Sequence, residues 1–247
     1  MKAILSVLLI AFAGPLIAQR PAEDAIETSK GPLKIQPIKH ASLVLTWQNT
    51  TIYVDPDGGA KAFEGLAAPT IILITDIHGD HFNTETLLAI NSSKAVIVVP
   101  QAVADKLPEG LKSKAVVVRN GQTIQQSGVS IAAIPMYNLP QTDDARHTKG
   151  RGNGYVLTFG NKTVYISGDT SDIQEMRELK NIDVAFVCMN LPYTMDVKEA
   201  ADAVLAFKPK IVYPYHYRGQ KTQDFADALK GVAGVEVRQR RLEGEGN

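Results

Sequence analysis

An unbroken apolar run, residues 70–75, constrains the fold of this chain more than any other feature of the sequence. The run reads Thr-Ile-Ile-Leu-Ile-Thr, is rich in β-branched side chains and does not alternate with polar residues. Such a run is typical of a strand buried on both faces, because a strand with one wet face would alternate. The sheet that holds it therefore needs packed layers on both sides.

The two halves of the chain repeat one order of elements, in which strands come first and alternating strands and helices follow. The first half has expected strands at 33–38, 42–47, 51–54, 70–75 and 95–99, with helices at 84–90 and 102–106. A strand meander is expected over 116–118, 123–125 and 129–135. The second half has expected strands at 154–159, 163–167, 184–188, 210–213 and 235–237, with helices at 171–179, 197–207 and 223–229. This pattern predicts an α+β fold, an αββα sandwich of two mixed β-sheets with helices on the outer faces.

Composition and charge exclude several classes of function. The chain has 247 residues, 26 Lys and Arg against 26 Asp and Glu, and 45% hydrophobic residues. A neutral chain lacks the basic surface that long nucleic acid requires, so no nucleic-acid partner is expected. The single cysteine, Cys188, excludes an intramolecular disulfide and any multi-cysteine metal site, and in its apolar stretch it is expected to be a buried small residue. Any metal must therefore be held by His, Asp, Glu or Asn.

The start of the chain has the pattern of an export signal. Lys2 precedes an apolar run that is too short for a dedicated membrane span, and Gly14-Pro15 breaks it before Ala18. We expect residues 1–18 to be a signal peptide, 19–32 a flexible segment and 33–243 a single domain. The mature protein would then be periplasmic and not stably inserted in a membrane. An uncleaved anchor is the alternative.

Four potential metal ligands follow the buried strand within six residues. Asp76, His78, Asp80 and His81 lie in the segment Asp-Ile-His-Gly-Asp-His. Side chains two apart in extended backbone can point the same way, so one loop can serve two adjacent cations. Carboxylate and imidazole ligands suit zinc, with manganese or iron as alternatives. The simpler interpretation is a polar loop that leads into a helix capped by Asp80 or Asn83.

Two other expected strands also end in a potential ligand. Asp169 follows the strand 163–167, and His216 follows the strand 210–213. Taken singly, Asp169 is explained as a helix N-cap and His216 as a hydrogen-bonded loop residue. If the strand ends meet at one edge of the sandwich, the same two residues complete a pocket with the loop 76–81.

Taken in order, these motifs resemble the metallo-β-lactamase superfamily of hydrolases. The superfamily motif His-x-His-x-Asp-His is matched at 76–81 with Asp76 in the first place, and the bridging aspartate and last histidine are matched by Asp169 and His216. The segments 40–42 and 53–56, together with 191–195 and 199–200, are similar to the branch related to ascorbate-6-phosphate lactonases. The resemblance covers about residues 33–240.

The resemblance implies two cation positions. The first would use Asp76, His78 and Asp169, and the second Asp80, His81 and His216 with the shared Asp169. The superfamily's mid-chain histidine is missing after the strand 129–135. Either Asn138 takes its place as a weak oxygen ligand, or His147 folds back from a polar loop to take it. That loop could instead be a lid, with His147 in contact with the substrate. The implied cofactor is one or two Zn²⁺ ions, with Mn²⁺ or iron as alternatives.

Several residues beside these motifs are candidates for other roles. Tyr137, Tyr193 and Arg218 flank the expected metal loops, and with Asn138 they are candidate contacts for an anionic or carbonyl substrate. His40 is interpreted as a structural histidine at a strand start, with a hydrogen bond at the floor of the site as the alternative. Lys149 and Arg151 are either further substrate contacts or surface charges.

The implied activity is metal-dependent hydrolysis. A metal-activated hydroxide would attack a lactone, an ester or a phosphodiester, with Asp80 as the catalytic residue that accepts or relays a proton. The alternative is a non-catalytic periplasmic binding protein with a degenerate first metal position. Oxygen or redox chemistry at iron is a third option on the same fold. The expected partner is a small molecule; the sequence does not indicate the oligomeric state.

Overall fold

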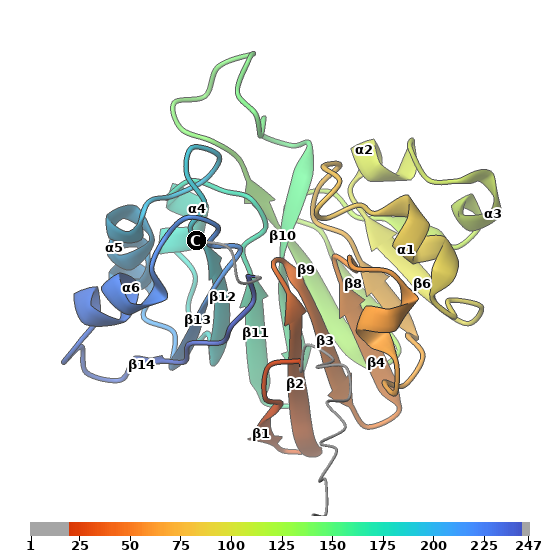
Figure 1. Cartoon of the computed structure of the whole chain (residues 1–247), viewed down its shortest axis with the longest axis horizontal. Helices are drawn as coiled ribbons and strands as arrows, with labels where there is room; N and C mark the ends of the chain where they lie inside the picture. The colour runs from red at the N-terminus through yellow and green to blue at the C-terminus, as the bar shows by residue number, and fades with distance from the viewer. Residues whose placement is uncertain (1–19, 244–247) are drawn as a thin grey trace, which may run out of the picture.

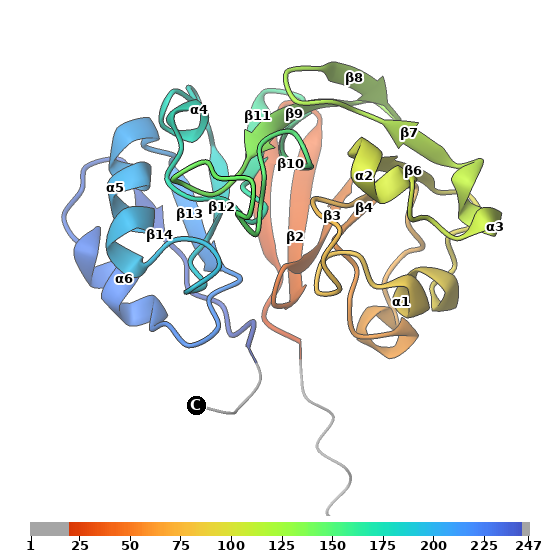
Figure 2. The ribbon, with the colours of Figure 1, turned by 90° about the horizontal axis from the view of Figure 1, so that it is seen from above.

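The computed structural model describes residues 20–243, which form two seven-stranded sheets packed face to face with helices outside (Figures 1 and 2). The first sheet contains β1 (Asp24–Thr28), β2 (Gly31–Lys39), β3 (Ser42–Trp47), β4 (Thr50–Val54), β5 (Ile71–Leu73), β6 (Val96–Val99) and β7 (Ala115–Val117). The second contains β8 (Thr123–Gln126), β9 (Val129–Met136), β10 (Gly152–Phe159), β11 (Lys162–Ile166), β12 (Val184–Cys188), β13 (Ile211–Tyr215) and β14 (Glu236–Val237). The expected αββα sandwich is confirmed.

Each sheet carries its own short helices. The first is covered by the 3₁₀ turn η1 (Ala60–Phe63), α1 (Thr84–Ala89), α2 (Gln101–Ala104) and α3 (Glu109–Lys112), and the second by α4 (Gln174–Arg177), α5 (Val197–Phe207) and α6 (Thr222–Ala228). Figure 2 shows the two helical layers on opposite outer faces of the sandwich. Among the described residues, no helix is long and apolar enough to cross a membrane.

The buried strand β5 explains why two layers are needed. Ile71 and Leu73 pack into the core between the sheets, while Ile72 and Ile74 pack under α1–α3, and all four side chains are fully buried. Alternate residues of a strand point to opposite faces, so both faces of this sheet are covered. Cys188 is a buried free thiol in β12, as expected.

Both sheets follow the same pairing pattern. The first four strands of each sheet pair antiparallel in sequence order, and the last three are added in parallel. The parallel strands end on the same edge in both sheets, because each is reached through a crossover connection. Ligand-bearing loops that are distant in sequence therefore meet at the upper edge of the sandwich in Figure 1.

Four expectations about the elements were wrong. The segment expected to be flexible, 19–32, contains β1, which pairs with β2. The expected meander is split, because β7 ends the first sheet and β8 begins the second. The helix expected over 171–179 is reduced to the single turn α4. The apolar spacing over 197–207 predicts Leu205 on the inward face of α5, but Leu205 is 38% exposed, while Ala203 and Phe207 are buried. The expected signal peptide, 1–18, lies outside the described residues.

Candidate metal centre at the edge of the two sheets

All five histidines of the chain converge on one edge of the sandwich. His78 and His81 follow β5, and His216 follows β13; His40 lies in the β2–β3 turn and His147 in the β9–β10 connection. Three groups of ligand atoms result, each with its atoms within 4.8 Å of one another: Asp76, His78 and His147; His81, Asp169 and His216; His40, Asp80 and His216. The last two groups share His216. Residues from both sheets contribute.

In the first group, the ring of His147 lies where the mid-chain ligand was expected. Its Nε2 is 3.2 Å from His78 Nδ1 and 3.7 Å from Asp76 Oδ2. Asn138 lies behind this ring, with its Oδ1 3.0 Å from both Nδ1 and the backbone nitrogen of His147. The structure therefore brings His147 into the group and makes Asn138 its outer hydrogen-bond partner, which leaves Nε2 for the site.

Asp76 is paired with an arginine that the sequence did not connect to it. Arg151 Nε lies 3.1 Å from Asp76 Oδ1, and Arg151 Nη2 lies 2.9 Å from Oδ2, in a two-point contact. Burial alone would raise the pKa of the fully buried Asp76, but its hydrogen bond with His78 and the charge of Arg151 outweigh this and lower it. Asp76 is therefore a carboxylate whose negative charge is balanced within the protein.

Asp169 links the first group to the second. Its Oδ2 lies 3.2 Å from His147 Nε2 and 3.3 Å from His81 Nε2, while its Oδ1 lies 3.4 Å from His216 Nε2. Burial alone would raise the pKa of Asp169, but the neighbouring histidines hold it well below its usual range. One carboxylate thus faces three imidazoles with its two oxygens.

His81 is held in place from behind by Asp55 and Thr75. Its Nδ1 lies 2.8 Å from Asp55 Oδ2 and 3.0 Å from Thr75 Oγ1, and Thr75 also donates its backbone N–H and its hydroxyl to Asp55. Burial alone would lower the pKa of His81, but the carboxylates of Asp169 and Asp55 raise it well above its usual value. This arrangement fixes the ring with Nε2 toward Asp169.

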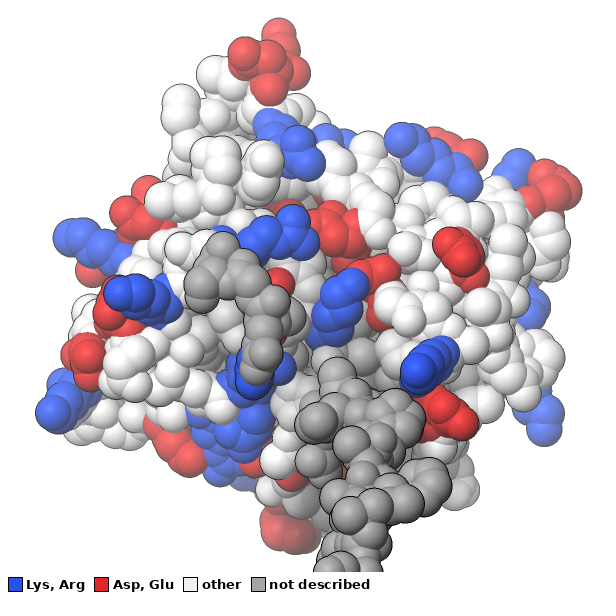
Figure 3. Space-filling model, in the orientation of Figure 1, with Lys and Arg blue, Asp and Glu red and all other residues white. Residues whose placement is uncertain are grey.

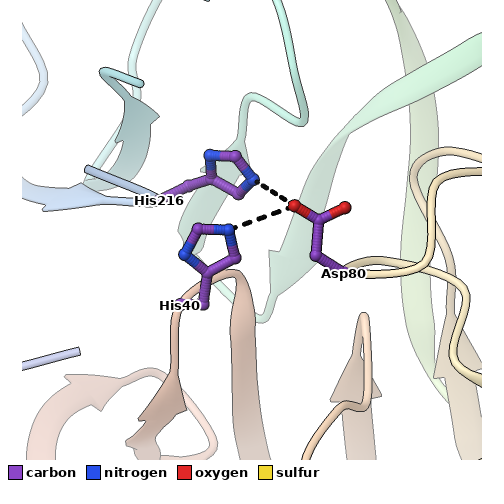
Figure 4. A group of neighbouring side chains, drawn as sticks. All are labelled: His40, Asp80 and His216. Atoms are coloured by element: carbon purple, nitrogen blue, oxygen red, sulfur yellow. Dashed lines mark hydrogen bonds and ion pairs between the residues drawn. The ribbon is translucent and has the colours of Figure 1, made fainter. Parts of the chain in front are cut away.

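Asp80 lies between two histidines in the third group. Its Oδ2 is 3.2 Å from His40 Nε2 and 3.4 Å from His216 Nε2 (Figure 4). Burial alone would raise the pKa of Asp80, but its close contacts with His216 and His40 hold it well below its usual range. A low pKa keeps Asp80 ionised, which suits cation binding. The N-cap of α1 is Asn83 and not Asp80.

The donor set fits a divalent cation. Among the described residues, His81 Nε2, Asp169 Oδ1 and both ring nitrogens of His216 are buried without a hydrogen bond. Two ligands about 2.0–2.1 Å from one tetrahedral ion are about 3.3–3.4 Å apart. The contacts of Asp169 and Asp80 with the histidines, 3.2–3.4 Å, are within 0.1 Å of that separation. Unpartnered buried nitrogens and oxygens at such separations are explained by a cation among them.

Exposed apolar and cationic side chains lie on the two loops that meet at Asn138, the hydrogen-bond partner of His147, and we call these loops the rim. Leu139, Leu191 and Tyr193 are 49%, 51% and 40% exposed, and the guanidinium of Arg146 lies 4.4 Å from the centre of the Tyr193 ring. Asn138 Nδ2 donates to the backbone oxygen of Tyr193, which ties the two rim loops together. On the face in Figure 3, cationic and anionic side chains are interspersed.

The remaining expected contacts divide by exposure. Tyr137 is only 5% exposed and its hydroxyl donates to Glu175. Arg218 is exposed near Glu243, whose pKa it helps to lower. Lys149 pairs with Glu175.

Two hollows differ in their relation to the site. One of about 220 Å³ lies within the loop 138–149 and is lined by residues including His147. A larger one, about 410 Å³, lies between α5 and α6 and is lined by none of the clustered ligands. The smaller hollow is therefore the one that adjoins the candidate metal ligands.

Comparisons with known proteins agree with this geometry. Residues 34–216 match the family model described as a beta-lactamase superfamily domain. A UPF0173 metal-dependent hydrolase of Pyrococcus abyssi is 31% identical over 194 residues, covering 75% of this chain and 84% of its own length. A solved Parabacteroides distasonis protein, assigned as a metal-dependent hydrolase, is 41% identical with a TM-score of 0.82 and covers 90% of this chain and 100% of its own. The metallo hydrolase Igni18 of Ignicoccus hospitalis, 20% identical with a TM-score of 0.72 over 86% of this chain and 96% of its own, shares the fold.

Proposed function

The chain belongs to the beta-lactamase superfamily and is a metal-dependent hydrolase, and from this premise we propose that it uses zinc to hydrolyse a lactone or another carboxylic ester. The observation that carries the proposal is the position of Asp169. Its two oxygens face His147 of the first ligand group and His81 and His216 of the second. A carboxylate shared in this way supports two adjacent cations.

The residues that would hold the cations are those of the superfamily pattern. His78, His147 and Asp76 would hold the first, and Asp80, His81 and His216 the second, with Asp169 shared. Imidazole and carboxylate donors without cysteine suit Zn²⁺, and Mn²⁺ or iron are alternatives. When bound, the cation supplies acidification of water and electrostatic stabilisation of the oxyanion that develops during hydrolysis.

The protein's own groups position the reactants. Asp80 is one-third exposed at its side chain, and it would accept a hydrogen bond from the attacking water. Because its pKa is held low, its role is to orient the water and to take its proton only transiently. Asn138 and Asp55 orient His147 and His81, so that the ligand nitrogens are aimed before substrate arrives.

The rim supports a substrate with an apolar part next to an anionic or carbonyl group. Leu139, Leu191 and Tyr193 offer apolar surface, and Arg146 brings a guanidinium to the same place. Lactones and esters of carboxylic acids can present both features. A phosphodiester presents its charge at the reacting atom, which makes it the second candidate.

The test compares substrates on protein of known metal content. The protein is stripped with chelator, reloaded with Zn²⁺, Mn²⁺ or Fe²⁺, and assayed with p-nitrophenyl butyrate, γ- and δ-lactones and bis-p-nitrophenyl phosphate. We expect the zinc form to hydrolyse the ester and lactones at least 100-fold faster than His216→Ala. Turnover of the phosphodiester alone, or equal rates in His216→Ala, would overturn the proposed substrate class.

We further propose that the protein is exported and acts in the periplasm on a small molecule. The support is the sequence pattern of residues 1–18, a basic start followed by a short apolar run. Cell fractionation of an expressing bacterium, with N-terminal sequencing of the product, should give a periplasmic chain that begins at Gln19. A cytoplasmic product that retains Met1 would contradict export.

A further inference from the structure

His40 is the histidine of the cluster that the superfamily motif does not use. Its side chain is 2% exposed and lies in the β2–β3 turn, with its ring against that of His216 at 3.8 Å between centroids. Its Nε2 is 3.2 Å from Asp80 Oδ2, and its Nδ1 is 2.6 Å from Glu243 Oε1. Both ring nitrogens therefore have a carboxylate neighbour.

The surroundings of His40 match those of His81 and His147. In each of these three histidines, Nδ1 contacts an oxygen of a residue that is not in the three ligand groups: Glu243 for His40, Asp55 for His81 and Asn138 for His147. In each, Nε2 faces a carboxylate that is in those groups, from Asp80 for His40 and from Asp169 for the other two. An outer acceptor on Nδ1 fixes the ring and its tautomer, so that Nε2 keeps its lone pair for a cation. His40 therefore has the hydrogen-bonding environment that is typical of a metal-ligand histidine.

The fold places His40 and His147 in equivalent positions. His40 lies between the second and third strands of the first sheet, and His147 lies between the second and third strands of the second sheet. The two sheets share one pairing pattern, so these two connections lie at the same edge of the sandwich.

The backbone at His40 is also in an uncommon conformation. His40 has φ 51° and His216 has φ 47°, in the left-handed region that glycine or asparagine would adopt at lower cost. The two segments are joined directly, because the backbone N–H of His216 donates to the oxygen of His40 at 3.3 Å. The backbone N–H of His40 donates to Leu242, which brings Glu243 to the site.

We propose that His40 Nε2 is a direct ligand of the cation held by Asp80 and His216, with Glu243 as the outer acceptor that fixes its ring. The separations of Asp80 Oδ2 from His40 and His216, 3.2 and 3.4 Å, are those of ligands on a common ion (Figure 4). This inference rests on the proposed metal-dependent function. It adds a ligand from β2–β3 and makes the C-terminal segment part of the site.

The experiment measures metal binding directly. Metal-free wild type, His40→Ala, His40→Gln and Glu243→Gln are titrated with Co²⁺, and we record stoichiometry, affinity and the visible absorption spectrum. The His40→Gln side chain can still donate a hydrogen bond to Asp80 but is a poor cation ligand. We expect both His40 variants to lose at least tenfold in affinity at one position and to change the spectrum. Glu243→Gln should weaken binding by about 10–100-fold with the stoichiometry retained.

The controls separate this inference from the proposed function. Tyr213→Phe removes a hydrogen bond to Asp24, which is not one of the clustered ligands, and should bind Co²⁺ as wild type does. If His40→Gln keeps the affinity and spectrum of wild type, His40 is a hydrogen-bond donor and the inference is wrong, whatever the activity. If wild type itself binds no divalent ion, the proposed function fails. Should His40→Ala not fold, the Gln variants decide.

Discussion

At the scale of single residues, the pair of Asp76 and Arg151 explains how an aspartate can stand where the superfamily motif has a histidine. A carboxylate in place of an imidazole adds a negative charge to a buried site. Arg151 meets both oxygens of Asp76 at 2.9 and 3.1 Å, and it adds one positive charge. The pair therefore carries the same net charge as the neutral histidine that it replaces.

This explanation predicts that the two residues are coupled. In metal-free protein, Arg151→Gln should lower the free energy of unfolding by about 3 kcal/mol, because it leaves Asp76 buried without its guanidinium partner. Asp76→His alone should also be destabilising, since Arg151 then loses its partner. The double variant Asp76→His/Arg151→Gln should recover at least half of the summed loss. Urea denaturation gives the three values, and strictly additive losses would show that the residues are independent.

The sequence predicted the site residues that follow an expected strand, and it missed those that reach the site only through long-range packing. Asp76, His78, Asp80 and His81 follow a buried strand in one short segment, so local pattern was enough. Asp55 also follows a strand and could have been found by the same signal. Arg151 and Glu243 have no local sequence signal. Their partners, Asp76 and His40, are 75 and 203 residues away and contact them only because the sheets pack together.

At the scale of elements, strand β10 brings the two sheets close enough to form the site. The backbone N–H of Asn153 donates to the oxygen of Thr75 at 2.9 Å, which joins β10 to the end of the first sheet. A Cβ on Gly154 would lie 2.8 Å from the backbone oxygen of Ser167, beside the loop of Asp169. The glycine is therefore required by the close approach of two backbones.

Gly154→Ala should consequently disturb both stability and metal binding. We expect a loss of about 1–3 kcal/mol in the free energy of unfolding, because backbone atoms must move to admit the methyl group. The displaced Asp169 loop should also weaken cation binding, as measured by titration. Gly110→Ala is the matched control, since its Cβ would meet no atom within 4 Å in α3, and it should be neutral or slightly stabilising. Equal stability of the two variants would contradict the close-approach argument.

Asp183 links the N-terminal ends of strands β11, β12 and β13. It accepts hydrogen bonds from the backbone N–H of Thr163 in β11 and from Lys210 before β13, while it precedes β12 itself. Burial alone would raise the pKa of Asp183, but these contacts and Lys162 outweigh it and lower the pKa. A carboxyl with a lowered pKa in the folded state stabilises the fold at neutral pH, and this contribution is lost as pH falls through that lowered pKa.

Asp183→Asn should therefore destabilise the protein in a pH-dependent way. We expect a loss of about 1–2 kcal/mol at pH 7, since Lys210 is well exposed and its charge is screened. The difference between wild type and variant should begin to shrink below about pH 4, where the carboxyl becomes protonated in the unfolded chain, and should be lost as pH falls through the lowered pKa of the folded state. Chemical denaturation between pH 3 and 7 measures this. A difference that stays constant over the range would mean that the charge of Asp183 has no part in stability.

The elements that the sequence predicted well are those with a clear period. β3, β12 and α5 have the expected bounds, because each has a long apolar pattern that ends at a turn or a capping residue. β1 was missed because it is a polar edge strand whose one large apolar residue is Ile26. It is held by Arg240, which pairs with Asp24 from a segment 216 residues away. Local sequence does not contain that contact.

At the scale of the whole molecule, the site lies where two sheets of the same topology meet. Asp55 follows the fourth strand of the first sheet, and Asp169 follows the fourth strand of the second. His81 stands between these two topological counterparts, with Nδ1 toward Asp55 and Nε2 toward Asp169. Neither sheet alone assembles the ligand groups, so a cation bound there joins the two halves of the fold.

Metal removal should for this reason lower the stability of the entire domain. A ligand that binds only the folded state at 100 times its dissociation constant adds about 2.7 kcal/mol, which corresponds to about 5–10 °C in the melting temperature of a domain of this size. Chelated protein should melt lower by that amount, and the midpoint should rise again with added Zn²⁺ in a concentration-dependent way. His216→Ala should melt at nearly the same temperature with and without zinc, because it lacks a ligand that two of the groups share. Wild-type protein that is free of metal and yet melts at the temperature of the zinc-loaded form would show that the two sheets hold together without a bound cation.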